Sequence, residues 1–218
     1  MSLLRAFTAI EIPRAIQLAI WQATSPLRNE LGSRIRWTPP ENIHLTLKFL
    51  GDISPASVDD LARALRAAVE TIPAFDIQVG GFGSFPNFKR ASILWVGTQP
   101  PTEVDALYRE VESACGRLGF APESRGFSPH LTIARVKADG SAADRNKILR
   151  LLESTTIDVL GAVRVDSAHL FKSDLKPSGA VYTKLFSAPL RDVMLSEPKS
   201  LPPPNGGSSP SAQNDTTL

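Results

Sequence analysis

Two of the three histidines in this 218-residue chain stand in the same pattern of histidine, apolar residue, threonine and apolar residue. The two copies are His44-Leu45-Thr46-Leu47 and His130-Leu131-Thr132-Ile133. In a β-strand, residues i and i+2 point to the same face. Each copy therefore predicts a strand that carries an imidazole and a hydroxyl side by side, with its apolar residues packed into a core behind them.

Two imidazoles and two hydroxyls around one pocket are suited to phosphate chemistry. An imidazole titrates near neutral pH, so one ring can be neutral while the other is charged. The neutral ring takes a proton from water and the charged ring gives one to a leaving oxygen, on opposite sides of a phosphoryl group. Threonine hydroxyls and a cation would hold the non-bridging oxygens. We interpret His44, Thr46, His130 and Thr132 as the catalytic residues of a metal-independent phosphodiesterase, without deciding which histidine is the acid.

A cyclic phosphate is an apt substrate for such a site, because its leaving oxygen stays tethered and ring strain helps the reaction. A metal site is the main alternative use of the two histidines. Metal-binding histidines usually have Cys, Asp, Glu or another His at close spacing. Threonine takes that place here, and the sequence has no HExxH motif and no cysteine pair. We predict no metal and no other cofactor, and we assign a structural role to the third histidine, His169.

Lys48 and Arg135 follow the two motifs and are the candidate substrate-binding cations. Strict alternation puts Lys48 on the face of His44, where it lines the cleft or reaches solvent, and puts Phe49 in the core. Arg135 comes five residues after His130, so it points to the opposite face unless a bend or bulge turns it toward a phosphate. An arginine fork is well shaped to bind phosphate oxygens.

Three further features are interpreted mainly as structural. Trp37 and Phe127 could stack on a base, although packing is the commoner role of such residues. The run Gly80-Gly81-Phe82-Gly83 resembles a phosphate loop only superficially, because no helix with Lys and Ser or Thr follows it. We expect a turn before a strand at this run, and the sequence contains no Walker motif elsewhere.

The hydrophobic pattern predicts a chain of alternating strands and helices. Strands are expected over residues 3–12, 35–38, 42–50, 75–79, 91–96, 128–136, 157–171 and 180–187. Helices are expected over residues 14–31 with a possible break at Pro26, from Ser54 or Ser57 to about Ile72, and over 101–118 and 141–153.

The order of these elements contains an internal repeat. A strand followed by proline and a helix begins at Pro13 and again at Pro100, an offset of 87 residues. The two histidine motifs are offset by 86 residues. Offsets that agree this closely indicate a duplicated strand–helix–strand unit. Such halves commonly pack about a pseudo-two-fold axis, which would bring the two histidines face to face.

The composition limits the remaining choices. With 42% apolar residues, we expect a single domain over residues 1–191 and a disordered Ser/Pro/Gly-rich tail over 192–218. Residues 192–218 contain three acidic side chains and one lysine, so residues 1–191 carry a net charge of +4. That charge suits a small polyanion better than duplex nucleic acid.

The sequence also bears on location and partners. The lone Cys115 excludes an internal disulfide and favours a reducing compartment. We find no signal peptide and no apolar stretch of about 18 residues that could span a membrane. We therefore expect a cytoplasmic protein with no membrane partner, acting as a monomer without an obligatory protein partner.

The residues around the two motifs resemble those of the 2H phosphoesterase superfamily, within it the RNA 2′,3′-cyclic phosphodiesterase group, historically called 2′-5′ RNA ligases. The resemblance covers about residues 3–190. It rests on Arg36-Trp37, Pro40-Glu41-Asn42, His44-Leu45-Thr46-Leu47-Lys48-Phe49-Leu50-Gly51, Gly81 with Phe85-Pro86, Leu94-Trp95-Val96-Gly97, Phe127-Ser128-Pro129-His130-Leu131-Thr132-Ile133-Ala134-Arg135, Ser173-Asp174-Leu175 and Tyr182-Thr183.

The resemblance implies a bilobal α+β fold, in which two pseudo-symmetric halves with antiparallel sheets flank a central cleft that holds both motifs. It implies hydrolysis of RNA 2′,3′-cyclic phosphate ends to 2′-phosphomonoesters, with His44 as the proton donor to the 3′ oxygen and His130 as the base that activates water. It implies that Thr46, Thr132 and Arg135 contact the phosphate. Several members of the group also run the chemistry backwards and join RNA ends through a 2′-5′ linkage.

Two other functions remain open at this point. One is a phosphodiesterase that acts on small cyclic nucleotides, which the sequence does not separate from an enzyme acting on RNA ends. The other is a module that binds RNA ends without turnover. The paired histidines and threonines argue against the second, because a pure binding module needs no paired proton-transfer groups.

Overall fold

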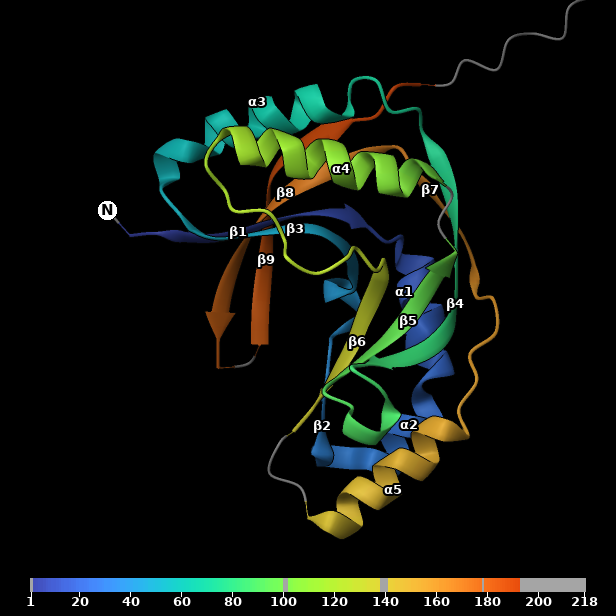
Figure 1. Cartoon of the computed structure of the whole chain (residues 1–218). Coiled ribbons are helices and arrows are strands. Elements are labelled where there is room, and N and C mark those ends of the chain that lie inside the picture. The colour runs from blue at the N-terminus through green and yellow to red at the C-terminus, as the bar shows by residue number, and fades with distance from the viewer. Residues whose placement is uncertain (1, 100–101, 138–140, 178, 193–218) are drawn as a thin grey trace, which may run out of the picture.

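The computed structural model describes residues 2–99, 102–137, 141–177 and 179–192. They form an α+β fold of two lobes, which confirms the expected fold class (Figure 1). The tail predicted over 192–218 lies outside the described residues except for Asp192, and so does Pro100 of the predicted repeat.

Within the described residues, nine strands join into one curled antiparallel sheet of order β7-β4-β5-β6-β3-β1-β8-β9, with β2 also pairing to β6. The first lobe contains β1 (Leu4–Glu11), β3 (His44–Ile53), β8 (Ser167–Lys176) and β9 (Gly179–Pro189). The second lobe contains β2 (Ile35–Trp37), β4 (Phe75–Phe85), β5 (Ile93–Gln99), β6 (His130–Val136) and β7 (Gly161–Val165).

The two lobes meet along β3 and β6, the strands that carry the histidine motifs. Leu45 of β3 pairs with Leu131 of β6, and this pair joins the two half-sheets into one. The strand order is symmetric about the junction, because β1 and β5 lie next to it, then β8 and β4, then β9 and β7. This symmetry agrees with the duplicated unit that the motif offsets indicate.

The helices cover each lobe from outside the junction. Figure 1 shows α3 (Val58–Val69) and α4 (Thr102–Arg117) over the first lobe, and α1 (Arg14–Ala23), α2 (Ser25–Leu31) and α5 (Ala142–Glu153) with the second. The helix expected over 14–31 is two helices, since Pro26 lies in the first turn of α2, where its missing N–H costs no hydrogen bond. None of the helices in the described residues is both long and apolar enough to cross a lipid bilayer.

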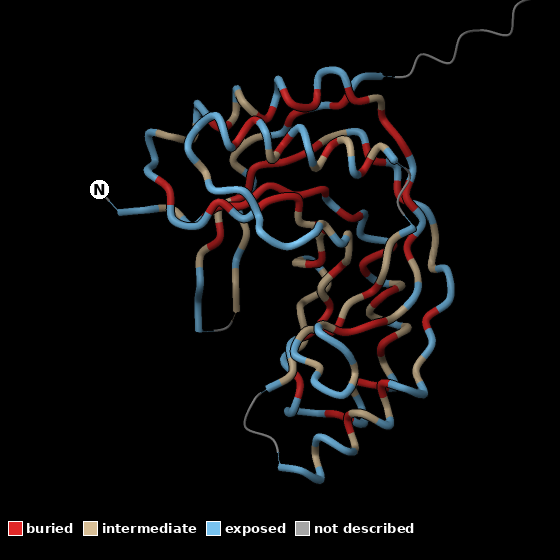
Figure 2. Tube along the Cα trace, viewed as in Figure 1, coloured by how far each residue is buried: buried red, intermediate tan, exposed pale blue. Residues whose placement is uncertain are grey.

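The core lies between the strands and these helices, and Figure 2 shows buried residues running through the strands of both lobes. The apolar residues of the histidine motifs belong to this core: Leu45, Leu47, Leu131 and Ile133. Their burial fixes which face of β3 and β6 is left for the histidines, because neighbouring residues of a strand point to opposite faces.

Two expectations about the strands are wrong. The strand expected over 157–171 is two strands, β7 and β8, separated at Asp166, and β8 continues to Lys176. The run of glycines at 80–83 lies inside β4 and not in a turn before the next strand. The absence of a side chain matters at Gly83, where a Cβ would lie 2.2 Å from the Trp95 ring. Gly83 therefore lets the indole lie against β4.

Candidate active site

A β-bulge interrupts each histidine motif at its fourth residue. The register of β3 against β1 shifts just after Thr46, which leaves Leu47 without a partner. The register of β6 against β5 shifts just after Thr132, which leaves Ile133 without a partner. An extra residue in a strand reverses the alternation of the side chains that follow it. The residue five places after each histidine therefore returns to the histidine face.

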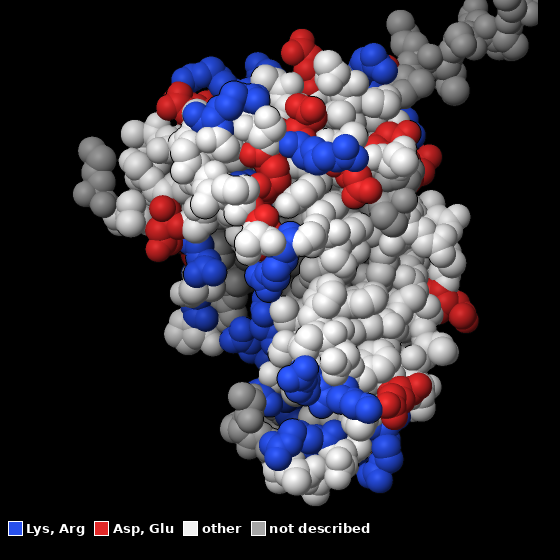
Figure 3. Space-filling view, in the orientation of Figure 1, with Lys and Arg blue, Asp and Glu red and all other residues white. Residues whose placement is uncertain are grey.

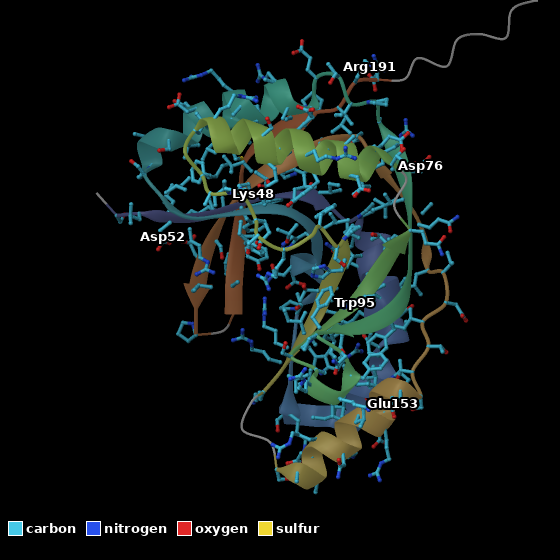
Figure 4. All side chains as sticks on the ribbon, viewed as in Figure 1. Lys48, Asp52, Asp76, Trp95, Glu153 and Arg191 are labelled. Carbon is cyan, nitrogen blue, oxygen red and sulfur yellow. The ribbon has the colours of Figure 1, made fainter. Side chains whose placement is uncertain are left out.

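The bulge in β3 overturns two expectations. Lys48 is only 5% exposed and lies between β3 and α4 (Figure 4). Its Nζ donates to Glu112 Oε1 at 2.7 Å and to the Ala121 carbonyl at 2.9 Å. Phe49, expected in the core, is 64% exposed and lines the cleft. The prediction that Lys48 shares the face of His44 and binds the substrate is wrong, because strict alternation ends at the bulge.

The bulge in β6 has the opposite consequence for Arg135. It turns this side chain to the histidine face, the exception that the sequence allowed for. Arg135 is exposed, lies opposite Arg36 of β2 in register, and lines the same cavity as Thr132. Its guanidinium is therefore available to an anion that binds beside the threonine.

The junction of the lobes brings the four motif residues together. The antiparallel strands β3 and β6 pair at Leu45 and Leu131, so the residues that flank Leu45, His44 and Thr46, lie near those that flank Leu131, His130 and Thr132. A cleft of about 730 Å³ opens over the part of this face that carries His44, Thr46 and Thr132. Its lining includes His44, Thr46, Phe49, Thr132, Arg135 and Tyr182.

The two imidazoles are held in the same way. The Nδ1 atom of His44 lies 2.8 Å from the Asn42 carbonyl oxygen, and that of His130 lies 2.6 Å from the Ser128 carbonyl oxygen. A carbonyl only accepts, so Nδ1 carries the proton and donates it. The Nε2 atom of each neutral ring is then the free nitrogen, which can accept a proton from a reactant.

Aromatic side chains cover part of both rings, and both histidines are half-buried. The His44 ring stacks on Phe7 at a centroid distance of 4.8 Å and meets the edge of Tyr182 at 5.3 Å. The His130 ring meets Phe85 edge-on at 4.8 Å, and Phe85 lies 5.5 Å from Trp95 of β5 (Figure 4). Each lobe thus provides an apolar wall that orients its own histidine.

This burial lowers the pKa of both histidines. Loss of solvation lowers the pKa of His44 to about 4, the Asn42 carbonyl opposes the fall, and the charge of His130 adds to it. Burial also lowers the pKa of His130, the Ser128 carbonyl opposes the fall, and the charge of Arg135 adds to it. Both shifts favour the neutral rings at pH 7 in the free protein. A bound phosphate would raise these pKa values, because an anion favours the charged ring.

The remaining candidates fall outside the reaction centre or at its edge. Trp37 is half-buried and lines the cleft, whereas Phe127 stacks on Tyr108 at 4.0 Å and packs against α4. His169 is buried, and its Nδ1 lies 2.9 Å from Ser187 Oγ, which fits the structural role expected of it. Among the described residues, no three His, Cys, Asp or Glu side chains gather closely enough to hold a metal ion.

The family resemblance included Phe85 and Tyr182, but the sequence reasoning gave no role to the residues that surround the two rings. Phe7, Phe85 and Tyr182 come from strands far along the chain from the histidines they contact, so no local spacing marks them. Arg36 belongs to the resemblance as well, but its pairing with Arg135 depends on how the two lobes meet.

Comparison with known proteins gives a consistent result. A sequence profile of the 2′-5′ RNA ligase superfamily matches residues 14–177. The chain is 30% identical over 187 residues to an RNA 2′,3′-cyclic phosphodiesterase of Aquifex aeolicus, covering 84% of this chain and 95% of that protein. It is 29% identical over 181 residues to a protein of the same name from Methanothermobacter thermautotrophicus, covering 83% of this chain and 96% of that protein.

Solved structures share the fold. A Thermus thermophilus protein matches with a TM-score of 0.72 at 24% identity, covering 87% of this chain and 99% of that chain. E. coli LigT in complex with 3′-AMP matches with a TM-score of 0.67 at 26% identity, covering 86% of this chain and 98% of that chain. With two histidine motifs meeting at the centre of such a fold, this chain belongs to the 2′-5′ RNA ligase superfamily.

Proposed function

We propose that this protein hydrolyses 2′,3′-cyclic phosphate ends of RNA to 2′-phosphomonoesters by metal-independent acid–base catalysis. The observation that carries the proposal is the antiparallel pairing of Leu45 with Leu131, which brings two imidazoles and two threonine hydroxyls to one face of the sheet. The names of the Aquifex and Methanothermobacter relatives, both RNA 2′,3′-cyclic phosphodiesterases, support this substrate. The complex of E. coli LigT with 3′-AMP supports a nucleotide in the cleft.

The proposed reaction is an in-line displacement at phosphorus. His130 Nε2 takes a proton from water as the water oxygen forms a bond to phosphorus. The bond from phosphorus to the 3′ oxygen breaks, and His44 Nε2 gives its proton to that oxygen. Thr46, Thr132 and Arg135 hold the non-bridging oxygens, where negative charge develops in the transition state. The products are a terminal 2′-phosphate and a free 3′-hydroxyl.

The division of roles between the histidines follows the family resemblance. Burial alone favours the reverse, because His44 is more deeply buried and holds a proton less readily than a typical histidine. The proton donor must therefore acquire its proton together with the anionic substrate, whose charge compensates for the lost solvation. Substrate binding and charging of His44 are coupled in this scheme.

The remaining features of the proposal concern the whole chain. The same site would join RNA ends through a 2′-5′ linkage when the reaction runs backwards, with no need for ATP. Residues 1–191 would form the complete catalytic domain, and residues 192–218 would be dispensable for it. We also propose that the protein acts as a monomer in the cytoplasm, without an obligatory protein partner.

One assay tests the proposed function. The protein is incubated with EDTA and an oligoribonucleotide that ends in a 2′,3′-cyclic phosphate, and the phosphomonoester is identified by phosphorus NMR. We expect a 2′-phosphate as the only product. Formation of the 3′-phosphate would contradict the proposed leaving group, and loss of all activity in EDTA would contradict metal independence.

A further inference from the structure

Two cavities border His44, and they differ in charge. One is the cleft, and the other, here called the side cavity, has a volume of about 840 Å³. His44 and Tyr182 line both cavities, and a 2.8 Å hydrogen bond from Asn42 Nδ2 to the Ala180 carbonyl joins residues that also line both. Substrate that reaches His44 can therefore extend to either side.

The side cavity carries balanced charge. Its described lining contains three cations and three acids: Arg14, Arg164, Lys184, Glu11, Glu41 and Asp166. Each cation has an acidic partner, since Arg14 lies 3.7 Å from Glu41, Lys184 lies 2.6 Å from Glu11 and Arg164 lies 3.4 Å from Asp76. A second phosphate would find no unpaired cation there.

The cleft carries only positive charge. Its described lining contains four cations and no acidic residue, and the cations are Arg5, Arg36, Arg135 and Lys176. None of the four takes part in an ion pair with another residue of the described ranges 2–99, 102–137, 141–177 and 179–192. Figure 3 shows Lys and Arg side chains on both sides of the hollow between the β8–β9 hairpin and the second lobe.

These cations form two groups, one on each lobe. Arg36 and Arg135 lie in register on β2 and β6, and β6 also carries Thr132, so one cyclic phosphate can use them. Arg5 and Lys176 belong to the first lobe instead. Arg5 is two residues before Phe7 on β1, which places it about 7 Å further along the strand from the ring that stacks on His44.

The two groups face a common space. Burial raises the pKa of Tyr182, and the charges of Arg135 and Arg5 both oppose that rise. Tyr182 therefore lies within the electrostatic reach of one cation from each group. A single terminal phosphate bound at Arg135 leaves Lys176 without an anion, and it leaves Arg5 with Asp52 of β3, which lies opposite Arg5 in register but does not form an ion pair with it.

An exposed aromatic ring, that of Phe49, lines the same cleft as Arg5 and Lys176. Phe49 is 64% exposed, and its ring centroid is 6.2 Å from that of Phe7. Phe7 in turn stacks on His44 at 4.8 Å. Aromatic rings beside a basic groove are the usual platform on which single-stranded nucleic acid stacks its bases.

We propose that Arg5, Lys176 and Phe49 form a subsite for the nucleotide that precedes the RNA end. Arg5 and Lys176 bind the phosphodiester that joins this nucleotide to the terminal one, and Phe49 stacks on a base. This inference rests on the proposed function and narrows it, because the preferred substrate is then an oligonucleotide end and not a cyclic mononucleotide.

Binding of two reaction products tests the subsite without requiring turnover. Adenosine 2′-monophosphate has only the terminal phosphate, and the dinucleotide ApA with a 2′-phosphate adds one internal phosphodiester. Isothermal titration calorimetry at several salt concentrations should find the dinucleotide bound at least about 10-fold more tightly. The slope of log affinity against log salt should be steeper for the dinucleotide by about 0.7, the value for one phosphate of a single strand.

Variants separate the parts of the subsite. In Arg5→Gln/Lys176→Gln, the affinity ratio of dinucleotide to mononucleotide should fall at least about 3-fold and the extra salt dependence should disappear. In Phe49→Ala, the ratio should also fall at least about 3-fold but with the salt dependence kept, and Phe49→Tyr should restore the ratio. The matched control is Arg164→Gln, which removes one positive charge from the side cavity and should leave the ratio unchanged.

The outcomes are decisive in either direction. Equal binding of both products by the unsubstituted protein would overturn the subsite, and so would a ratio that survives in Arg5→Gln/Lys176→Gln. A fall of the ratio in Arg164→Gln as large as in that double variant would also overturn it. Hydrolysis of a 2′,3′-cyclic mononucleotide, measured separately, reports on the proposed function alone, so failure of one claim is distinguishable from failure of the other.

Discussion

His44 and His130 are held by equivalent hydrogen bonds, each from Nδ1 to the carbonyl of the residue two positions upstream. The distances are 2.8 Å to Asn42 and 2.6 Å to Ser128. A backbone acceptor cannot be removed by substitution, so the tautomer of each ring is fixed by the fold itself. Both Nε2 atoms are then left for the reaction, which is the arrangement that a paired acid and base require.

Removing either ring should abolish most of the activity. We expect His44→Ala and His130→Ala each to lower kcat/KM at least about 100-fold, because each removes one proton-transfer group. Kinetics on a cyclic-phosphate oligonucleotide measure the loss, and circular dichroism checks the fold. His169→Gln is the matched control, since its ring lies outside the cleft. Full activity in both alanine variants would exclude the acid–base pair.

A sulfur leaving group should distinguish the acid from the base. In a cyclic substrate with sulfur in place of the 3′ oxygen, the leaving thiolate needs no proton, because a thiol has a pKa near 8.5. We expect this substrate to restore most of the rate of His44→Ala and little of the rate of His130→Ala. Rescue of His130→Ala instead would reverse the two roles.

Stability should depend on pH through His44. Folding lowers the pKa of His44 to about 4, so between pH 6.5 and 4 the unfolded chain binds a proton that the native protein does not. Native stability therefore falls as the pH falls through this window, by about 3 kcal/mol for this one group. Urea unfolding at pH 7 and pH 4 should show a loss in the unsubstituted protein that exceeds the loss in His44→Phe by that amount. Equal losses in the two proteins would mean that His44 is not buried in neutral form.

Lys48 and Phe49 are consecutive, but substitutions should affect different properties. Lys48→Met leaves Glu112 without its cation, and breaking a buried pair of this kind costs about 3 kcal/mol of unfolding free energy. Adding Glu112→Leu should recover part of that loss. Phe49→Ala should change stability by less than about 1 kcal/mol, because most of its ring is exposed. If Lys48→Met were as stable as the unsubstituted protein but had a raised KM for the substrate, Lys48 would instead be a substrate-binding residue in the cleft.

The pattern of the sequence was sufficient to predict the two motif strands and most helix positions, and the family resemblance added the α+β class. These features depend on local periodicity, as in the strand from His44 and the helix expected over 141–153. The side-chain directions beyond the motifs could not be predicted from alternation. Lys48 and Phe49 exchange faces because of one unpaired residue, Leu47, whose identity as an ordinary strand-forming leucine gives no sign of a bulge.

The wider site depends on contacts between distant strands. Phe7 stacks on His44 only because β1 pairs with β3, and Arg36 meets Arg135 only because β2 crosses to the second lobe. Such pairings are set by packing of the whole chain, which spacing along the sequence does not encode. The bulge in β6 also had to be known before Arg135 could be predicted to point toward the threonines.

A crystal structure of the protein with a nucleoside 2′-monophosphate in the cleft would test the central claim most directly. We expect the Nε2 atoms of His44 and His130 to lie within about 3.2 Å of different oxygens of the same phosphate. A phosphate that contacts only one of the two rings, or that binds away from both, would contradict the proposed mechanism.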